Sequence, residues 1–229
     1  MKPKHLKIEK DFYDEAYQDP ATRLERGYGW GTTPSPSMVA LFEKHVKRIY
    51  YGNVLDIGIG ADGRNAKYFL EKNIPLLGID ISENALRNCC ETIGGYPRFY
   101  LENLDFTLPT ALLDSHLKLD LAFSLVIDWS VMDHIRRAYL PAYKDNILSC
   151  LRYGGYLISS QFADPLPEKF KVPKGKDFCL WGKHYMRCFT IEKLIAEFPA
   201  LKVIDYMENC PEDDVNGIKI HSVLFQKVA

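Results

Sequence analysis

The sequence predicts an α/β protein built on a doubly wound, mainly parallel sheet. Apolar segments with the length of buried strands alternate with segments whose apolar residues recur three or four positions apart. Strands that are apolar throughout are typical of a parallel sheet that helices cover on both faces. In such a sheet, ligands bind at the carboxyl ends of the strands, near the point where the strand order reverses.

The expected elements follow one another along a chain of 229 residues. Strands are expected at 53–59, 75–81, 98–101, 119–127, 155–162, 201–206 and 218–228. Helices are expected at 64–72, 83–93, 135–151 and 190–198, with an interruption near Pro141. Ser82 and Thr190 are suited to cap the second and the last of these helices. Residues 163–188, which are rich in lysine, proline and aromatic residues, are expected to be irregular.

The first 52 residues are expected to form a helical cover. Ser35 can cap a helix that begins at Pro36, and apolar residues recur at helical spacing from Val39 onwards. We therefore divide the chain into a cover at 1–52 and an α/β domain at 53–229, with a lid insertion at about 163–188.

Composition excludes several classes of function. The formal net charge is −1, so no bulk field attracts the chain to nucleic acid or anionic lipid. None of the six cysteines forms a CxxC pair, and no cluster has metal-ligand spacing, so no metal is expected. Reduced thiols and the lack of a signal peptide predict a cytoplasmic protein. No apolar run approaches about 18 residues, so no membrane span is expected.

The strongest functional signal is a glycine-rich turn after the first predicted strand, Asp56-Ile57-Gly58-Ile59-Gly60, followed by Gly63. Glycines let the backbone turn sharply and approach a ligand closely. Asp80 lies 22 residues after Gly58, at the end of the second strand, with Ile81 beside it. A carboxylate at that position can accept hydrogen bonds from two ribose hydroxyls. This pattern fits NAD and S-adenosylmethionine (SAM) equally well.

The negative charge of Asp56 distinguishes between these two ligands. A dinucleotide would place an anionic pyrophosphate beside this carboxylate, whereas SAM places a cationic ammonium and sulfonium there. Opposite unit charges about 4 Å apart attract by about 4 kcal/mol at an effective dielectric constant of about 20. The charge favours SAM, with the alternative that Asp56 only caps a turn.

These residues resemble the glycine motif of class I SAM-dependent methyltransferases, in which an acid precedes Gly-x-Gly. Asp80 is similar to the family's ribose-binding acid, and Asn103-Leu104-Asp105 resembles its adenine-edge motif. Leu151 to Leu157 resembles its Leu-x-x-Gly-Gly turn. One departure concerns the third glycine, because Gly63 follows Gly60 by three residues where the family's glycine follows by two.

The resemblance implies a seven-stranded sheet whose last strand is antiparallel, and SAM as the cofactor. Together with the rule for strand ends, it predicts a set of cofactor-binding residues. They are Asp56, Gly58, Gly60, Gly63, Asp80, Ile81, Leu104, Asp105 and Ser124.

The segment from Gly29 to Pro36 resembles a Trp-x-x-x-x-Pro segment near the start of thiol, halide and tellurite methyltransferases. In those relatives this segment covers SAM and the acceptor. The alternative is that Trp30 only packs the cover onto the sheet. Substrate contacts are expected from four aromatic residues, Tyr28, Trp30, Trp129 and Trp181.

Candidate acids and bases follow the fourth predicted strand, where acceptors bind. Asp128 and His134 are the catalytic candidates, because either can hold or deprotonate an acceptor and histidine titrates near neutral pH. The alternative for His134 is a structural role at the start of a helix. His184 and Tyr185 have a similar position in the order of elements.

The predicted function is SAM-dependent methyl transfer to a small-molecule acceptor, without a membrane or a nucleic acid as partner. An RNA or protein methyltransferase is one alternative, supported only by the lysines at 169, 171, 174 and 176. A non-catalytic SAM-binding protein is another. An NAD-dependent dehydrogenase is disfavoured by Asp56.

Overall fold

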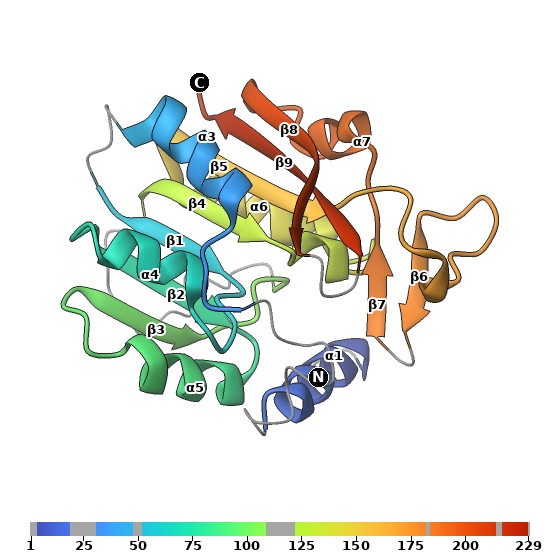
Figure 1. Ribbon diagram of the computed structural model, residues 1–229, viewed down its shortest axis with the longest axis horizontal. Coiled ribbons are helices and arrows are strands. Elements are labelled where there is room, and N and C mark those ends of the chain that lie inside the picture. Colours follow the sequence, from blue (N-terminus) through green and yellow to red (C-terminus); the bar gives the residue numbers. More distant parts are fainter. Residues whose placement is uncertain are drawn as a thin grey trace.

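The computed structural model describes residues 4–18, 31–47, 52–108, 122–181, 184–213 and 217–228. Its centre is a seven-stranded sheet with the strand order β3-β2-β1-β4-β5-β9-β8 (Figure 1). The strands are β1 (Val54–Ile57), β2 (Leu76–Asp80), β3 (Phe99–Asn103), β4 (Phe123–Trp129), β5 (Leu151–Phe162), β8 (Lys202–Asp213) and β9 (Ile218–Gln226).

The strands β1 to β5 pair in parallel, and β9 runs antiparallel to both of its neighbours, β5 and β8. The order reverses at β1, which lies between β2 and β4. The predicted doubly wound sheet is therefore confirmed, as is the antiparallel last strand. The switch point, where such sheets bind ligands, lies at the carboxyl ends of β1 and β4.

Helices cover both faces of the sheet (Figure 1). On one face, apolar residues of α3 (Pro36–Leu41), α4 (Arg64–Leu70) and α5 (Glu83–Ile93) join one core cluster. On the other face, α6 (Leu140–Cys150) and α7 (Ile191–Ala196) join a second cluster. Along β1, Val54 belongs to the first cluster and Leu55 to the second. This alternation is what a fully buried strand requires.

The local signals at the helix starts are confirmed. Ser35, Ser82 and Thr190 each accept a backbone hydrogen bond at the start of α3, α5 and α7.

Pro141 lies in the first turn of α6, so it begins this helix and does not interrupt a longer one. The expected start at residue 135 is therefore wrong. Residues 132–134 form a separate 3-10 turn, η3 (Met132–His134).

The sequence predicts an irregular segment at residues 163–188, and this prediction is wrong in part. They contain the short turn η4 (Glu168–Phe170) and an antiparallel hairpin, β6 (Phe178–Trp181) and β7 (His184–Arg187). The N-terminal helix α1 (Lys4–Ala16) contacts both α5 and β7. No helix in the described residues is long and apolar enough to cross a membrane.

Candidate functional site

A cavity lies beside the carboxyl ends of β1, β2 and β4 and is covered by α1. Its walls are formed by residues 56–65, 79–81, 104–107 and 129–131, by His134, Ile135, Arg136, Tyr139 and Tyr143, and by Glu9, Tyr13 and Tyr17. The sequence pattern predicted the wall residues that lie directly after the strands, such as those at 56–65 and 79–81. The topology places them together because parallel strands end at the same edge of the sheet.

Asp80 connects β2 to the glycine-rich turn. Its Oδ2 accepts a hydrogen bond from the backbone N–H of Gly60 at 3.0 Å, and its Oδ1 accepts one from Ser82 N–H at 2.9 Å. Burial raises the pKa of Asp80 to about 6, and these two amides oppose the rise. A carboxylate has about four lone-pair positions, so Asp80 can accept further hydrogen bonds from the cavity side.

Glycine is required at each position of the turn for a different physical reason. Gly58 and Gly60 have φ of +63° and +67°, in the left-handed region that favours glycine. A Cβ on Gly60 would meet the Tyr17 hydroxyl at 3.7 Å and the Gly58 carbonyl oxygen at 4.0 Å, so this backbone faces the cavity. A Cβ on Gly63 would lie 2.5 Å from Ile93 Cδ1, so Gly63 allows close packing of α4 on α5.

Asp56 gives the base of the cavity a negative charge when it is ionised. Its side chain is buried in β1, and this burial raises the pKa of Asp56 to about 8. The Arg64 guanidinium opposes the rise, whereas Asp80 and Asp128 add to it. Four carboxylates line the cavity on this side, Asp56, Asp62, Asp80 and Asp105. Such a wall suits a ligand with positive charge.

The loop after β3 is held against the end of β2. Leu104 N–H donates to the Asp80 carbonyl oxygen at 3.1 Å, and Asn103 Nδ2 donates to the carbonyl oxygens of Asp80 and Ile81, each at 3.0 Å. Asp105 Oδ1 accepts from the Thr107 hydroxyl at 2.6 Å. These bonds keep Leu104 and Asp105 in the cavity wall.

His134 lies on the far side of the cavity, in η3. Its Nδ1 is 3.1 Å from the carbonyl oxygen of Tyr185, and a carbonyl only accepts, so Nδ1 carries the proton. Burial lowers the pKa of His134 to about 4, which makes the ring neutral at pH 7. In this tautomer Nε2 holds a lone pair and can accept a proton. Asp133 Oδ1 is 3.3 Å from Nε2, and burial raises the pKa of Asp133 to about 8.

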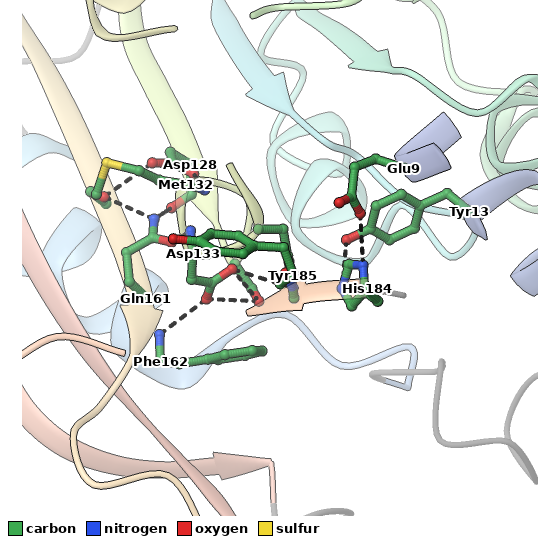
Figure 2. Close-up of polar contacts among 12 residues, drawn as sticks. Glu9, Tyr13, Asp128, Met132, Asp133, Gln161, Phe162, His184 and Tyr185 are labelled. Atoms are coloured by element: carbon green, nitrogen blue, oxygen red, sulfur yellow. Dashed lines mark hydrogen bonds and ion pairs between the residues drawn. The ribbon is translucent and has the colours of Figure 1, made fainter. Parts of the chain in front are cut away.

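The helix α1 lies in the predicted N-terminal cover, and it adds Glu9 and Tyr13 to the cavity wall, two residues that the sequence pattern did not indicate. Glu9 Oε1 accepts from Arg136 at 3.0 Å, and Glu9 Oε2 lies 3.1 Å from His184 Nδ1. The Tyr13 hydroxyl lies 3.3 Å from His184 Nε2 (Figure 2). His184 is buried and tilted against His134, with ring centroids 4.4 Å apart. The available signal was spacing, because residues 9, 13 and 17 share one face of a helix.

No protein-family model and no curated protein matches the sequence at a significant level. Among solved structures, a 1,6-didemethyltoxoflavin N1-methyltransferase from Burkholderia thailandensis, with S-adenosylhomocysteine bound, is 19% identical with a TM-score of 0.66. That alignment covers 96% of this chain and 91% of the other.

Two further solved structures are similar to this chain. TehB from Haemophilus influenzae is 17% identical with a TM-score of 0.60, over 96% of this chain and 67% of its own. The [4+2]-cyclase SpnF is 14% identical with a TM-score of 0.68, over 99% and 98%. The chain has the fold of class I SAM-dependent methyltransferases. Because SpnF is described as a cyclase, this fold does not by itself determine the reaction.

Within this methyltransferase fold, two predicted site residues lie outside the cavity. β4 ends at Trp129, not at residue 127, so Ser124 lies near its amino end, beside Asn53. Asp128 is fully buried and lies beside Met132 (Figure 2). Its carboxylate accepts from Met132 N–H at 3.2 Å and from the Ser159 hydroxyl at 3.1 Å. Neither Ser124 nor Asp128 therefore lines this cavity.

Of the four aromatic residues predicted to contact the substrate, the structure describes the side chain of Trp129 only. Trp129 lines the cavity at the end of β4, with the Arg64 guanidinium carbon 4.0 Å from its ring centroid. Trp181 ends β6, and its side chain is outside the described residues, as are Tyr28 and Trp30. In the described residues, no group of three or more His, Cys, Asp or Glu side chains is placed to hold a metal ion.

Proposed function

We propose that this protein is a SAM-dependent methyltransferase with a small-molecule acceptor. The observation that carries the proposal is the pair Asp56 and Asp80 at the switch point of a methyltransferase fold. Asp80 presents hydrogen-bond acceptors at the end of β2, and Asp56 supplies negative charge at the end of β1. A ribose with two hydroxyls and an adjoining cation match these two groups.

The residues present fit this cofactor. Gly60 lines the cavity, its N–H donates to Asp80, and a Cβ on Gly60 would face the Tyr17 hydroxyl across this space. We assign Asp80 to the ribose, Leu104 and Asp105 to the adenine edge, and Asp56 to the cationic amino-acid end. When bound, SAM would supply a methyl group carried on a sulfonium, and the neutral thioether S-adenosylhomocysteine would be the leaving group.

The chain then needs to orient the acceptor and to remove a proton where the acceptor carries one. We assign proton removal to His134, whose Nε2 lone pair follows from the contact of Nδ1 with Tyr185. Tyr13, Tyr17 and Trp129 line the same cavity and would exclude water from the transferring methyl group. Residues 26–38 and 163–188 are proposed to complete the cover on the acceptor side.

A small acceptor is supported by the way α1 covers the cavity. Glu9 and Tyr13 approach the buried His184 of β7, and Asp14 accepts a hydrogen bond from the Ser82 hydroxyl at 2.7 Å, so both sides of α1 are anchored. A macromolecular substrate would have to displace this helix. The alternative of RNA depends on lysines 169–176, and it predicts binding that weakens steeply with salt.

The test begins with calorimetry of the full chain against SAM, S-adenosylhomocysteine and NAD. We expect the first two to bind and NAD not to bind; the reverse result would refute the proposal. A screen of SAM-dependent methylation then compares thiols, amines, phenols, carboxylates and RNA. Transfer to one of the small acceptors supports the proposal. Binding without any transfer would identify a non-catalytic SAM-binding protein, and transfer to RNA alone would favour the macromolecular alternative.

A further inference from the structure

Tyr13, His184 and Glu9 form a chain of contacts at the edge of the cavity (Figure 2). The Tyr13 hydroxyl lies 3.3 Å from His184 Nε2, and His184 Nδ1 lies 3.1 Å from Glu9 Oε2. Tyr13 and Glu9 belong to α1 and line the cavity, whereas His184 begins β7 and is buried outside the cavity wall. The chain of contacts therefore connects the cavity to the interior of the protein.

The hydrogens in this chain are fixed by what each group can donate. Burial raises the pKa of Glu9, but the Arg136 guanidinium, which donates to Glu9 Oε1 at 3.0 Å, opposes the rise and favours the carboxylate. A carboxylate only accepts, so His184 carries a hydrogen on Nδ1. Burial lowers the pKa of His184 well below its usual value, so the ring is neutral at pH 7 and has no second hydrogen. Nε2 is then an acceptor, and the Tyr13 hydroxyl donates to it.

The ring of His184 is held in this orientation by its neighbours. Phe12 stacks on it, with ring centroids 4.2 Å apart and an angle of 4° between the planes. The ring of His134 lies 4.4 Å away and is itself fixed by the contact of its Nδ1 with Tyr185. Because the ring is fixed, the direction of its Nε2 lone pair is fixed as well. The hydroxyl hydrogen of Tyr13 is therefore directed away from the cavity.

This arrangement determines what Tyr13 offers to a ligand. A tyrosine hydroxyl has one hydrogen and two lone pairs. Since the hydrogen is directed to His184, only lone pairs remain for a group in the cavity. A ligand atom beside Tyr13 is thus matched when it donates a hydrogen bond, whereas a carboxylate or a halide would face lone pairs.

Tyr13 also has a position suited to the atom that is methylated. Tyr17, one turn further along α1, faces the glycine-rich turn, because a Cβ on Gly60 would lie 3.7 Å from its hydroxyl. The Tyr13 ring centroid lies 6.1 Å from that of His134. A group bonded to Tyr13 would therefore lie close both to the proposed cofactor site and to the proposed base.

We propose that Tyr13 accepts a hydrogen bond from the acceptor atom, that Glu9 and His184 are the positioning residues that keep Tyr13 in this role, and that the acceptor is a neutral primary amine. Such a nitrogen has two hydrogens and one lone pair. One hydrogen binds Tyr13, and the lone pair forms the bond to the methyl group while the electron pair of the broken bond stays on the sulfur. The second hydrogen then leaves as a proton to His134. This inference rests on the proposed function and names its substrate class.

The first test measures the protonation of His184 in the nitrogen-15-labelled full chain. Proton–nitrogen correlation spectra at pH 7 should show a hydrogen on Nδ1 and none on Nε2. Tyr13→Phe should shift the Nε2 resonance, because its hydrogen bond is lost, whereas Tyr153→Phe, at a position that is 73% exposed, should not. A hydrogen on Nε2 in the wild-type chain would direct the Tyr13 hydrogen to the cavity and overturn the inference, and the proposed function would still stand.

The second test concerns Glu9 as a positioning residue. In Glu9→Gln the new amide can donate to His184 Nδ1, so a measurable fraction of the ring should carry its hydrogen on Nε2. Glu15→Gln, at an exposed position of the same helix, is the matched control. An unchanged tautomer in Glu9→Gln would overturn the role of Glu9.

The third test compares primary amines, secondary amines, phenols, thiols and carboxylates in the methylation screen. We expect transfer to a primary amine, with kcat/KM about 2- to 10-fold lower in Tyr13→Phe, the range for one neutral hydrogen bond. The affinity for S-adenosylhomocysteine should stay within about twofold of wild type. Transfer to the other classes alone, or cofactor binding without any transfer, would overturn the substrate class. If neither SAM nor S-adenosylhomocysteine binds, the proposed function fails and this inference fails with it.

Discussion

Asp80 Oδ2 accepts a hydrogen bond from the Gly60 backbone amide at 3.0 Å, and this contact joins the end of β2 to the turn after β1. The two residues are 20 positions apart in the sequence. Their contact sets the distance between the proposed ribose acceptor and the glycine backbone that a ligand must approach.

Removal of the Asp80 carboxylate should weaken cofactor binding. We expect Asp80→Ala to reduce the affinity for S-adenosylhomocysteine by about 1–3 kcal/mol, because a hydrogen bond to a charged group is lost. Calorimetry measures the change, and Asp145→Ala, at an exposed position of α6, is the matched control. Equal affinities in wild type and Asp80→Ala would contradict the assignment of Asp80 to the ribose.

Cofactor binding should release a proton near neutral pH. Burial raises the pKa of Asp56 to about 8 in the free chain, so at pH 7 the carboxyl is mostly protonated. A bound cation favours the carboxylate and expels that proton, so affinity should rise with pH from 6 towards 8 and level off above it. Binding heats measured at pH 7 in phosphate and in Tris should therefore differ. The same heat in both buffers, or an unchanged difference in Asp56→Asn, would exclude this role.

His134 should affect methyl transfer more than cofactor binding. With an acceptor found by the methylation screen, His134→Ala should lower kcat by about 10²- to 10⁴-fold, the usual contribution of a general base. Burial lowers the pKa of His134 to about 4, so protonation of this base should slow transfer only as the pH falls towards 4. His45→Ala, on the π-helical turn Phe42–Val46 (η1), is the control. Normal turnover of His134→Ala would leave a structural role only.

Gly63 should be required for stability. In Gly63→Ala the new Cβ would lie 2.5 Å from Ile93 Cδ1 and 2.8 Å from Cys89 Sγ, and its φ of +53° disfavours alanine. We expect the free energy of unfolding to fall by about 1–3 kcal/mol through overpacking, measured by urea denaturation. Gly95→Ala is the control, because a Cβ there meets no atom within 4 Å. Similar stabilities of the two variants would show that α4 and α5 tolerate a larger spacing.

The aromatic residues of the proposed cover should matter for the acceptor. Trp30→Ala and Trp181→Ala are expected to reduce methyl transfer more than SAM affinity, because they are assigned to the acceptor side. Leu180→Ala is the control, since Leu180 lies on the same hairpin and is 54% exposed. If both tryptophan variants turn over normally with a proven acceptor, these residues only pack the cover.

Local patterns in the sequence were sufficient for the scaffold and for the residues at the strand ends that line the cavity. Strand hydrophobicity, the caps Ser35, Ser82 and Thr190, and the glycine turn depend on neighbours that are close along the chain. The position of Asp80 followed from the end of one strand. Such features are readable because the period of a strand or the cap of a helix is set by a few consecutive residues.

The tertiary structure alone decided where β4 ends and how α1 encloses the cavity. Pairing with β1 reaches Asp128, and pairing with β5 extends β4 to Trp129. This register puts Asp128 in the buried network and Trp129 in the cavity wall. Glu9 and His184 are 175 positions apart and meet only when α1 packs against the β6–β7 hairpin. No local period encodes such a contact, because it depends on how separate elements pack on the finished sheet.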